Sequence, residues 1–159
     1  MAETMVFDPA EFVTEQVAAV KGQVGARTAV IAVSGGVDST IAAAIVHTAI
    51  GKQLHAVYVD TGFMRKGESE QVEAMYKRMG LNLTVVHAGP EYFEALKGIT
   101  EPEKKRKVIG EKFIRIFERE SKKTGATVLV QGTIAPDWIE SGGGKRDTIK
   151  SHHNVGGLP

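Results

Sequence analysis

A short apolar segment that runs directly into a glycine-rich loop constrains the fold of this chain more than any other feature. Thr28 to Val33 (TAVIAV) is apolar at nearly every position, as in a strand buried on both faces of a parallel sheet. Ser34 to Ser39 (SGGVDS) follows at once, and Thr40 to Ile50 is an alanine-rich apolar stretch that predicts a buried helix stopped by Gly51. This order predicts the first strand–loop–helix unit of an α/β fold.

The same alternation continues along the chain. The patterns predict strands at Leu54 to Val59, Leu81 to His87 and Ala126 to Val130, and helices at Glu68 to Met79 and Pro102 to Lys123. We therefore expect an open, Rossmann-like parallel sheet of about five strands, with helices on both faces and right-handed crossovers.

The first residues predict a separate amphipathic helix. Asp8 can cap it, Pro9 suits its first turn, and the valines that follow recur at helical spacing as far as Gly25. We expect residues 1–27 to form this helix and residues 28–159 to form a single domain. Ser141 to Thr148 (SGGGKRDT) is predicted to be a mobile loop.

Composition excludes several classes of protein. Twenty basic and 19 acidic residues nearly cancel, so the chain lacks the basic excess of a nucleic-acid binder. There is no cysteine, which excludes disulfides and thiolate metal sites. No signal peptide and no apolar run long enough to cross a membrane is present in the sequence, so we expect a cytoplasmic protein.

The glycine loop has the features of a phosphate cradle. Two glycines let the backbone approach an anion, the next helix directs its positive end there, and Ser34, Ser39 and Thr40 add hydroxyls. The loop has neither the lysine of a Walker A motif nor the G-x-G-x-x-G of a dinucleotide fold. It carries Asp38 instead, and a carboxylate beside a phosphate calls for a cation such as Mg²⁺. The alternative is an ordinary strand–turn–helix connection with glycines for packing.

The loop resembles the PP-loop of the ATP pyrophosphatases, whose fold is that of the adenine nucleotide α-hydrolases. Further stretches are similar to GMP synthases. They are VDTGFMRKGE after the second strand, PEKKRKVIG at Pro102 to Gly110, GTIAPDWIESGGG at Gly132 to Gly144 and IKSHHNVGGLP at Ile149 to Pro159. The resemblance covers nearly the whole chain from Ala29 onward and identifies it as a member of this family.

The resemblance implies a two-step ligase reaction that consumes ATP with Mg²⁺. The O2 atom of xanthosine monophosphate (XMP) attacks the α-phosphate of ATP, pyrophosphate leaves, and ammonia then displaces AMP to give GMP. The family also has a glutamine-hydrolysing part and a C-terminal dimerisation domain, and this sequence shows neither. We expect a separate glutamine amidotransferase subunit to supply the ammonia, and we leave open a homodimer formed through the missing domain.

The candidate site residues come partly from the resemblance and partly from their positions. The candidates for binding ATP or pyrophosphate are Ser34, Gly35, Gly36, Val37, Asp38, Ser39, Thr40, Asp60, Arg106, Thr133 and Lys150. Asp38 and Lys150 are expected to be catalytic, and Lys150 matches a lysine that meets the β,γ-phosphates in the family. Asp38 is the first metal candidate, with Asp137 or Glu140 as its partner.

Several of these residues have a second interpretation. Asp38 can also cap a helix, and Asp60 can be a turn residue rather than a nucleoside ligand. At about 100° per residue Arg106 falls in the core-facing stripe of its helix, which indicates either a phosphate or an internal carboxylate as its partner. His152 and His153 point to opposite faces of an extended segment, so a shared metal is not expected.

Two other functions remain open. One is a different PP-loop enzyme, either NAD synthetase-like or tRNA-modifying, although such tRNA enzymes usually have catalytic cysteines or a basic patch. The other is a non-catalytic ATP-binding module, which would leave Lys150 and the GTIAPDWIES stretch without a role.

Overall fold

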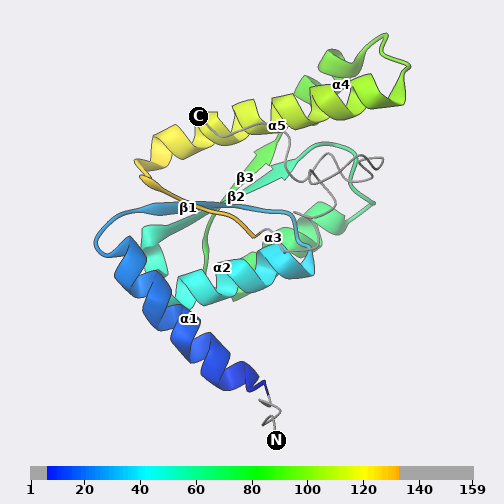
Figure 1. Cartoon of the computed structure of the whole chain (residues 1–159). Helices are drawn as coiled ribbons and strands as arrows, with labels where there is room; N and C mark the ends of the chain where they lie inside the picture. The colour runs from blue at the N-terminus through cyan, green and yellow to red at the C-terminus, as the bar shows by residue number, and fades with distance from the viewer. Residues whose placement is uncertain (1–6, 133–159) are drawn as a thin grey trace, which may run out of the picture.

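The computed structural model describes residues 7–132 and shows an α/β arrangement (Figure 1). Its elements along the chain are α1 (Pro9–Val24), β1 (Ala29–Val33), α2 (Val37–Ile50), the 3₁₀ turn η1 (Gly51–Gln53), β2 (Leu54–Asp60), α3 (Glu68–Arg78), β3 (Asn82–His87), α4 (Gly89–Leu96), α5 (Pro102–Thr124) and β4 (Val128–Val130). Every strand and helix predicted within these residues is present. None of the described helices is long and apolar enough to cross a membrane.

The strands form one parallel sheet in the order β3-β2-β1-β4. The described residues contain four strands, close to the expected five. Chain order runs outward from β1 through β2 to β3, and β4 then returns to the opposite side of β1. The direction of strand order therefore reverses between β1 and β4, and in open α/β sheets ligands bind beyond the carboxyl ends of the strands at such a point.

Helices cover both faces of the sheet, as the sequence predicts. Figure 1 shows α1, α2 and α3 on one side and α4 and α5 on the other. Alternate residues of each strand serve the two faces, because successive side chains of a strand point in opposite directions. In β1, Ile31 and Val33 join the core beneath α2 and α3, whereas Val30 joins the core beneath α4 and α5.

The helices before and after β1, α1 and α2, begin with different caps. The carboxylate of Asp8 accepts a hydrogen bond from the backbone N–H of Ala10 at 2.8 Å, so the predicted cap of α1 is confirmed. At α2 the N-cap is Gly36, and no side chain caps the helix within the part of the chain that is described. The first-turn N–H groups of α2 are therefore available to an anion.

The sequence did not predict α4. This helix of eight residues has Pro90 in its first turn, and its Tyr92 is wholly buried against Ile116 and Phe117 of α5. Arg119 of α5 also pairs with Glu91 of α4 at 3.2 Å. A short helix gives little periodic signal, and α4 is held by its packing on α5 rather than by its own propensity.

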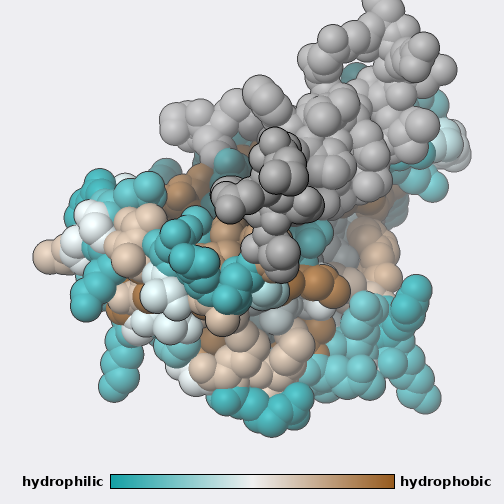
Figure 2. All heavy atoms as spheres, turned by 60° about the horizontal axis from the view of Figure 1, so that its bottom comes forward, coloured by the Kyte–Doolittle hydropathy of each residue, from teal (hydrophilic) through white to brown (hydrophobic). Residues whose placement is uncertain are grey.

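The face formed by α1, α2 and α3 has hydrophilic residues at its sides, with hydrophobic residues lying between them (Figure 2). The larger apolar side chains exposed there are Phe7, Phe12 and Val13 at the start of the chain and Val37 and Ile41 on α2. Val37 is 72% exposed although it belongs to the glycine loop region.

Two buried tyrosines provide a test of the core. The Tyr92 hydroxyl has no hydrogen-bond partner among the described residues, and burial, together with the charge of Glu91, raises the pKa of Tyr92 to about 12. The Tyr58 hydroxyl lies 3.2 Å from the Ser69 hydroxyl. We expect Tyr58→Phe to lower the free energy of unfolding by about 1 kcal/mol, and Tyr92→Phe to leave it unchanged or raise it. Urea unfolding of both variants measures this, and a larger loss in Tyr92→Phe would show that its hydroxyl has a partner.

Candidate functional site: a glycine loop at the switch point

The glycine loop lies where the strand order reverses. It joins β1 to α2, and the carboxyl end of β4 approaches it at Gly132. A Cβ added to Gly132 would lie 3.5 Å from the carbonyl oxygen of Asp38 and 3.5 Å from the Cα of Ser39. The segment that leaves β4 therefore passes directly against the first turn of α2.

Gly35 and Gly36 of the loop differ in backbone conformation and in packing. Gly35 has a φ of +82°, in the region that side chains disfavour, and a Cβ there would lie 2.5 Å from Cγ2 of Val72 in α3. Gly36 has an ordinary φ of −71°, and a Cβ there would meet only the Ser34 hydroxyl at 3.3 Å. Gly35 is thus required by the fold itself, whereas neither the backbone conformation nor the packing of Gly36 among the described residues demands glycine.

The hydroxyl groups of the loop bind to one another and to the backbone in this structure. Ser39 and Thr40 both donate to the carbonyl oxygen of Gly36, at 3.1 and 2.8 Å. The Ser34 and Ser39 hydroxyls lie 3.1 Å apart, and the Gly36 N–H reaches the Ser34 hydroxyl at 3.3 Å. The sequence predicted these hydroxyls as phosphate donors; the structure adds that they also hold the loop in shape.

Asp38 lies in the first turn of α2, exposed to solvent. Residues 7–132 contain no group of three or more histidine or acidic side chains placed to hold a metal ion together. A single carboxylate beside a bare amide cradle nevertheless fits Mg²⁺, which binds through one or two carboxylates together with phosphate oxygens. The proposed partners Asp137 and Glu140 lie outside the described residues, as do Thr133 and Lys150.

Asp60 is the last residue of β2, and its side chain stabilises the turn that follows, which is one of the two roles predicted for it. Its carboxylate accepts a hydrogen bond from the Gly62 N–H at 2.9 Å and lies 3.5 Å from Nδ1 of His87. Burial alone would raise the pKa of Asp60, but hydrogen bonds from Gly62, Ser69 and His87 outweigh it and hold the pKa below its usual value. A contact between Asp60 and a nucleoside stays a prediction.

The expectation that Arg106 faces the core is wrong. Arg106 is exposed, and its partner is Glu103 of the same helix, 2.9 Å away, rather than an internal carboxylate. In α5 the fully buried residues begin only at Ile116, while Ile109 and Phe113 of the same stripe are partly buried, so burial fades toward the start of the helix where Arg106 lies. Its role as a phosphate ligand stays a prediction that its burial no longer supports.

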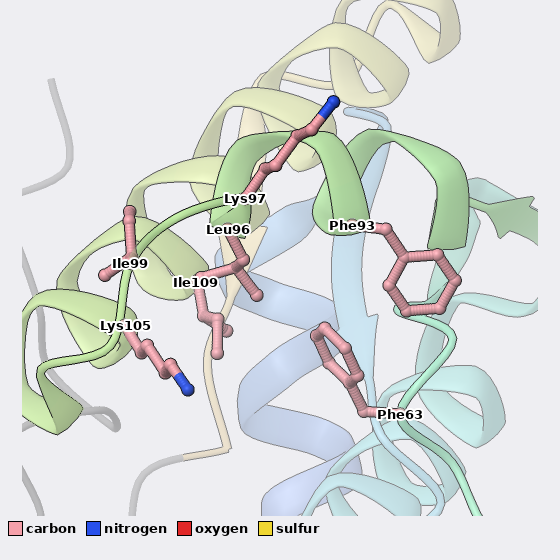
Figure 3. A pocket seen from close by; sticks show the side chains of 7 residues that line it. All are labelled: Phe63, Phe93, Leu96, Lys97, Ile99, Lys105 and Ile109. Atoms are coloured by element: carbon pink, nitrogen blue, oxygen red, sulfur yellow. The ribbon is translucent and has the colours of Figure 1, made fainter.

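An apolar groove lies beyond the end of β2 on the α4 and α5 side. Its volume is about 430 Å³, and its lining residues are Phe63, Phe93, Leu96, Lys97, Ile99, Lys105 and Ile109. Figure 3 shows the rings of Phe63 and Phe93 side by side, edge to face with centroids 5.5 Å apart, the amine of Lys105 directed toward the groove and that of Lys97 directed away. A groove of this size and composition can receive a planar apolar group that carries a negative charge. No sequence pattern indicates this groove, because its residues come from three separate segments.

Fold and site together define a class: a Rossmann-like α/β domain whose glycine loop, with uncapped helix amides, lies at the switch point of a parallel sheet. Comparison with known families narrows this class. The family model described as NAD synthase matches residues 8–116, and the chain belongs to that family.

Curated relatives with closer sequences each carry the name of one subunit of a glutamine-hydrolyzing GMP synthase. That of Methanopyrus kandleri is 59% identical over 97% of this chain, and that of Pyrococcus horikoshii is 56% identical over 96%. The chain spans about half the length of each relative, 48% in both cases. The resemblance to GMP synthases seen in the sequence is therefore confirmed.

Solved structures share the fold at much lower sequence identity. The NH3-dependent NAD synthetase from Campylobacter jejuni superposes with a TM-score of 0.74 at 13% identity, over 87% of this chain and 62% of that one. The NMN synthetase from Francisella tularensis gives a TM-score of 0.70 at 15% identity, over 85% of this chain and 58% of that one. These matches confirm the predicted fold class.

The different roles of the two glycines can be measured. We expect Gly35→Ala to destabilise the protein by about 1–3 kcal/mol from backbone strain, plus the cost of the contact with Val72. Gly36→Ala keeps an ordinary φ, so we expect a loss of about 1 kcal/mol or less. Chemical unfolding of the two variants gives the comparison. In a Val72→Ala background the penalty of Gly35→Ala should shrink but not vanish, and an unchanged penalty would contradict the contact.

The Asp60 interactions predict a pH dependence. A carboxyl group whose pKa is lower in the folded state stabilises the fold above its unfolded-state pKa, near 3.8, and loses that contribution as pH falls through the folded-state pKa. We therefore expect the gap in melting temperature between the wild type and Asp60→Asn to be full at pH 6 and to narrow below about pH 4. Thermal melts across this range test it, and a gap that widens in acid would refute the assignment.

Proposed function

We propose that the chain carries the ATP-pyrophosphatase part of a GMP synthase, a cytoplasmic ligase that forms a carbon–nitrogen bond. The observation that carries this proposal is a glycine loop with uncapped helix amides at the switch point, in a chain 59% identical to a GMP synthase subunit. In the proposed reaction O2 of XMP attacks the α-phosphorus of ATP and the bond to the β-phosphate breaks. Ammonia then attacks C2, the C–O bond breaks, and AMP leaves with GMP as product.

The residues have distinct tasks in this proposal. The amides at the start of α2, with Gly35 and Gly36, hold the β,γ-phosphates as they depart as pyrophosphate. Asp38 would hold Mg²⁺, whose charge offsets that of the leaving group. Thr133 and Lys150 would add contacts to the phosphates, and Asp137 or Glu140 would share the metal with Asp38.

The names of the curated relatives support the proposed substrates and partner. Each of those proteins is named as one subunit of a glutamine-hydrolyzing enzyme, which supports a separate glutamine amidotransferase subunit as the source of ammonia. In this proposal the groove of Phe63 and Phe93 near the end of β2 receives a purine ring, and an ionised group of the substrate lies near Lys105. An NAD synthetase-like reaction is the second candidate, because the family model and the solved structures carry that name.

A substrate panel tests this proposal. The chain, extended to the full length of its curated relatives, is supplied with ATP, Mg²⁺ and ammonium, together with XMP or with nicotinate adenine dinucleotide, and AMP formation is followed. We expect AMP to form when XMP is supplied and not when the dinucleotide is supplied. AMP formation with the dinucleotide instead would replace the proposal by its competitor.

Asp38→Asn is the matched variant in the same assay. It keeps the size of the side chain and removes the charge, so we expect the fold to persist and the rate of AMP formation to fall by about 10²–10³-fold, the cost of removing one such electrostatic contact. Asp8→Asn, which changes an equally exposed helix-cap carboxylate of α1, is the control. Equal rates of AMP formation in the two variants would show that Asp38 has no part in the site.

A further inference from the structure

Three donors converge on the carbonyl oxygen of Gly36. They are the backbone N–H of Thr40 at 3.1 Å, the Thr40 hydroxyl at 2.8 Å and the Ser39 hydroxyl at 3.1 Å. A carbonyl oxygen has two lone pairs, so this acceptor is fully used. The peptide bond is planar and trans, and the Val37 N–H therefore points opposite to the Gly36 carbonyl. Holding the carbonyl toward α2 aims the Val37 amide outward, where an anion would lie.

Tyr76 is the next member of this hydrogen-bonded chain. Its hydroxyl lies 2.9 Å from the Thr40 hydroxyl. Thr40 has a single hydroxyl proton, and it must give that proton to Gly36, because a carbonyl cannot donate. The Tyr76 hydroxyl is therefore the donor to Thr40. Linked hydrogen bonds of this kind polarise and strengthen one another.

The same helix supports the loop at a second point. Val72 and Tyr76 are four residues apart in α3 and so lie on one face of the helix. Val72 packs against Gly35, where no Cβ can fit, and Tyr76 is 0% exposed. Thus α3 forms the rear wall of the loop through a steric contact and a polar one.

We infer that Tyr76 is a positioning residue for anion binding, whose hydroxyl acts through Thr40 to hold the Gly36 carbonyl and so orient the amides of the loop. This inference rests on the proposed function of the loop as a pyrophosphate cradle. Tyr76 itself touches no ligand, because it is buried behind the loop. Its effect should therefore fall on ligands that carry β,γ-phosphates and not on AMP.

Tyr76→Phe removes only the hydroxyl and keeps the buried ring. By calorimetry with Mg²⁺ present, we expect this variant to bind inorganic pyrophosphate about fivefold more weakly than wild type, which corresponds to one net hydrogen bond. Binding of AMP should not change. The matched control is Tyr92→Phe, the same substitution at an equally buried tyrosine on the other face of the sheet, and its pyrophosphate affinity should equal that of wild type.

A double-mutant cycle with Thr40→Val tests whether Tyr76 acts through Thr40. Valine has nearly the shape of threonine and removes both of its hydrogen bonds, so adding Tyr76→Phe to Thr40→Val should cause no further loss. Additive losses would overturn the inference, as would equal pyrophosphate binding by Tyr76→Phe and Tyr92→Phe, or an equal weakening for AMP. In those cases wild-type binding of pyrophosphate would leave the proposed function standing. Failure of the wild-type chain to bind pyrophosphate or ATP would overturn both.

Discussion

The parallel pairing of β1 with β2 on one side and β4 on the other is the constraint on which the site depends. Because β1 is central and buried, its carboxyl end opens between two connections that leave in opposite directions. The loop that follows β1 is therefore placed at a crevice by topology before any side chain is considered. The close approach of Gly132 to the first turn of α2 brings the end of β4 to the same place. The polypeptide segments that meet there are far apart in sequence, and only the sheet joins them.

The shape of the loop is set from behind, by α3. Val72 excludes any side chain at Gly35, and Tyr76 meets Thr40, which in turn meets the Gly36 carbonyl. An anion site made of backbone amides depends on such support, because the amides can be aimed only by fixing the peptide planes that carry them. In this structure the hydroxyls of Ser39 and Thr40 fix the peptide plane through their hydrogen bonds to the Gly36 carbonyl. A phosphate arriving at the loop would meet a cradle whose internal hydrogen bonds are already formed, which lowers the cost of ordering it on binding.

The opposite face of the sheet has a different character. There α4 and α5 pack together through Tyr92, Ile116 and Phe117 and are linked by Arg119 and Glu91. Their ends leave an apolar groove beside Phe63, on the segment that follows β2. The described residues thus offer uncapped helix amides after β1 and an apolar groove after β2. Since the chain spans about half the length of its curated relatives, these surfaces account for part of the activity proposed for the whole protein.

The sequence by itself determined the α/β class, every strand and most helices of the described residues, and the glycine loop with Asp38 beside it. These features are local: apolar runs, helical spacing, caps and glycines act within a few residues of one another. Tertiary structure decided what the patterns could not. It placed Arg106 in solvent, because α5 extends beyond the core, and it held the short α4, because its burial on α5 outweighs its weak periodicity. It also gave Tyr76 a partner 36 residues away, and no pattern along one chain can tell a core tyrosine that fills space from one that holds a loop.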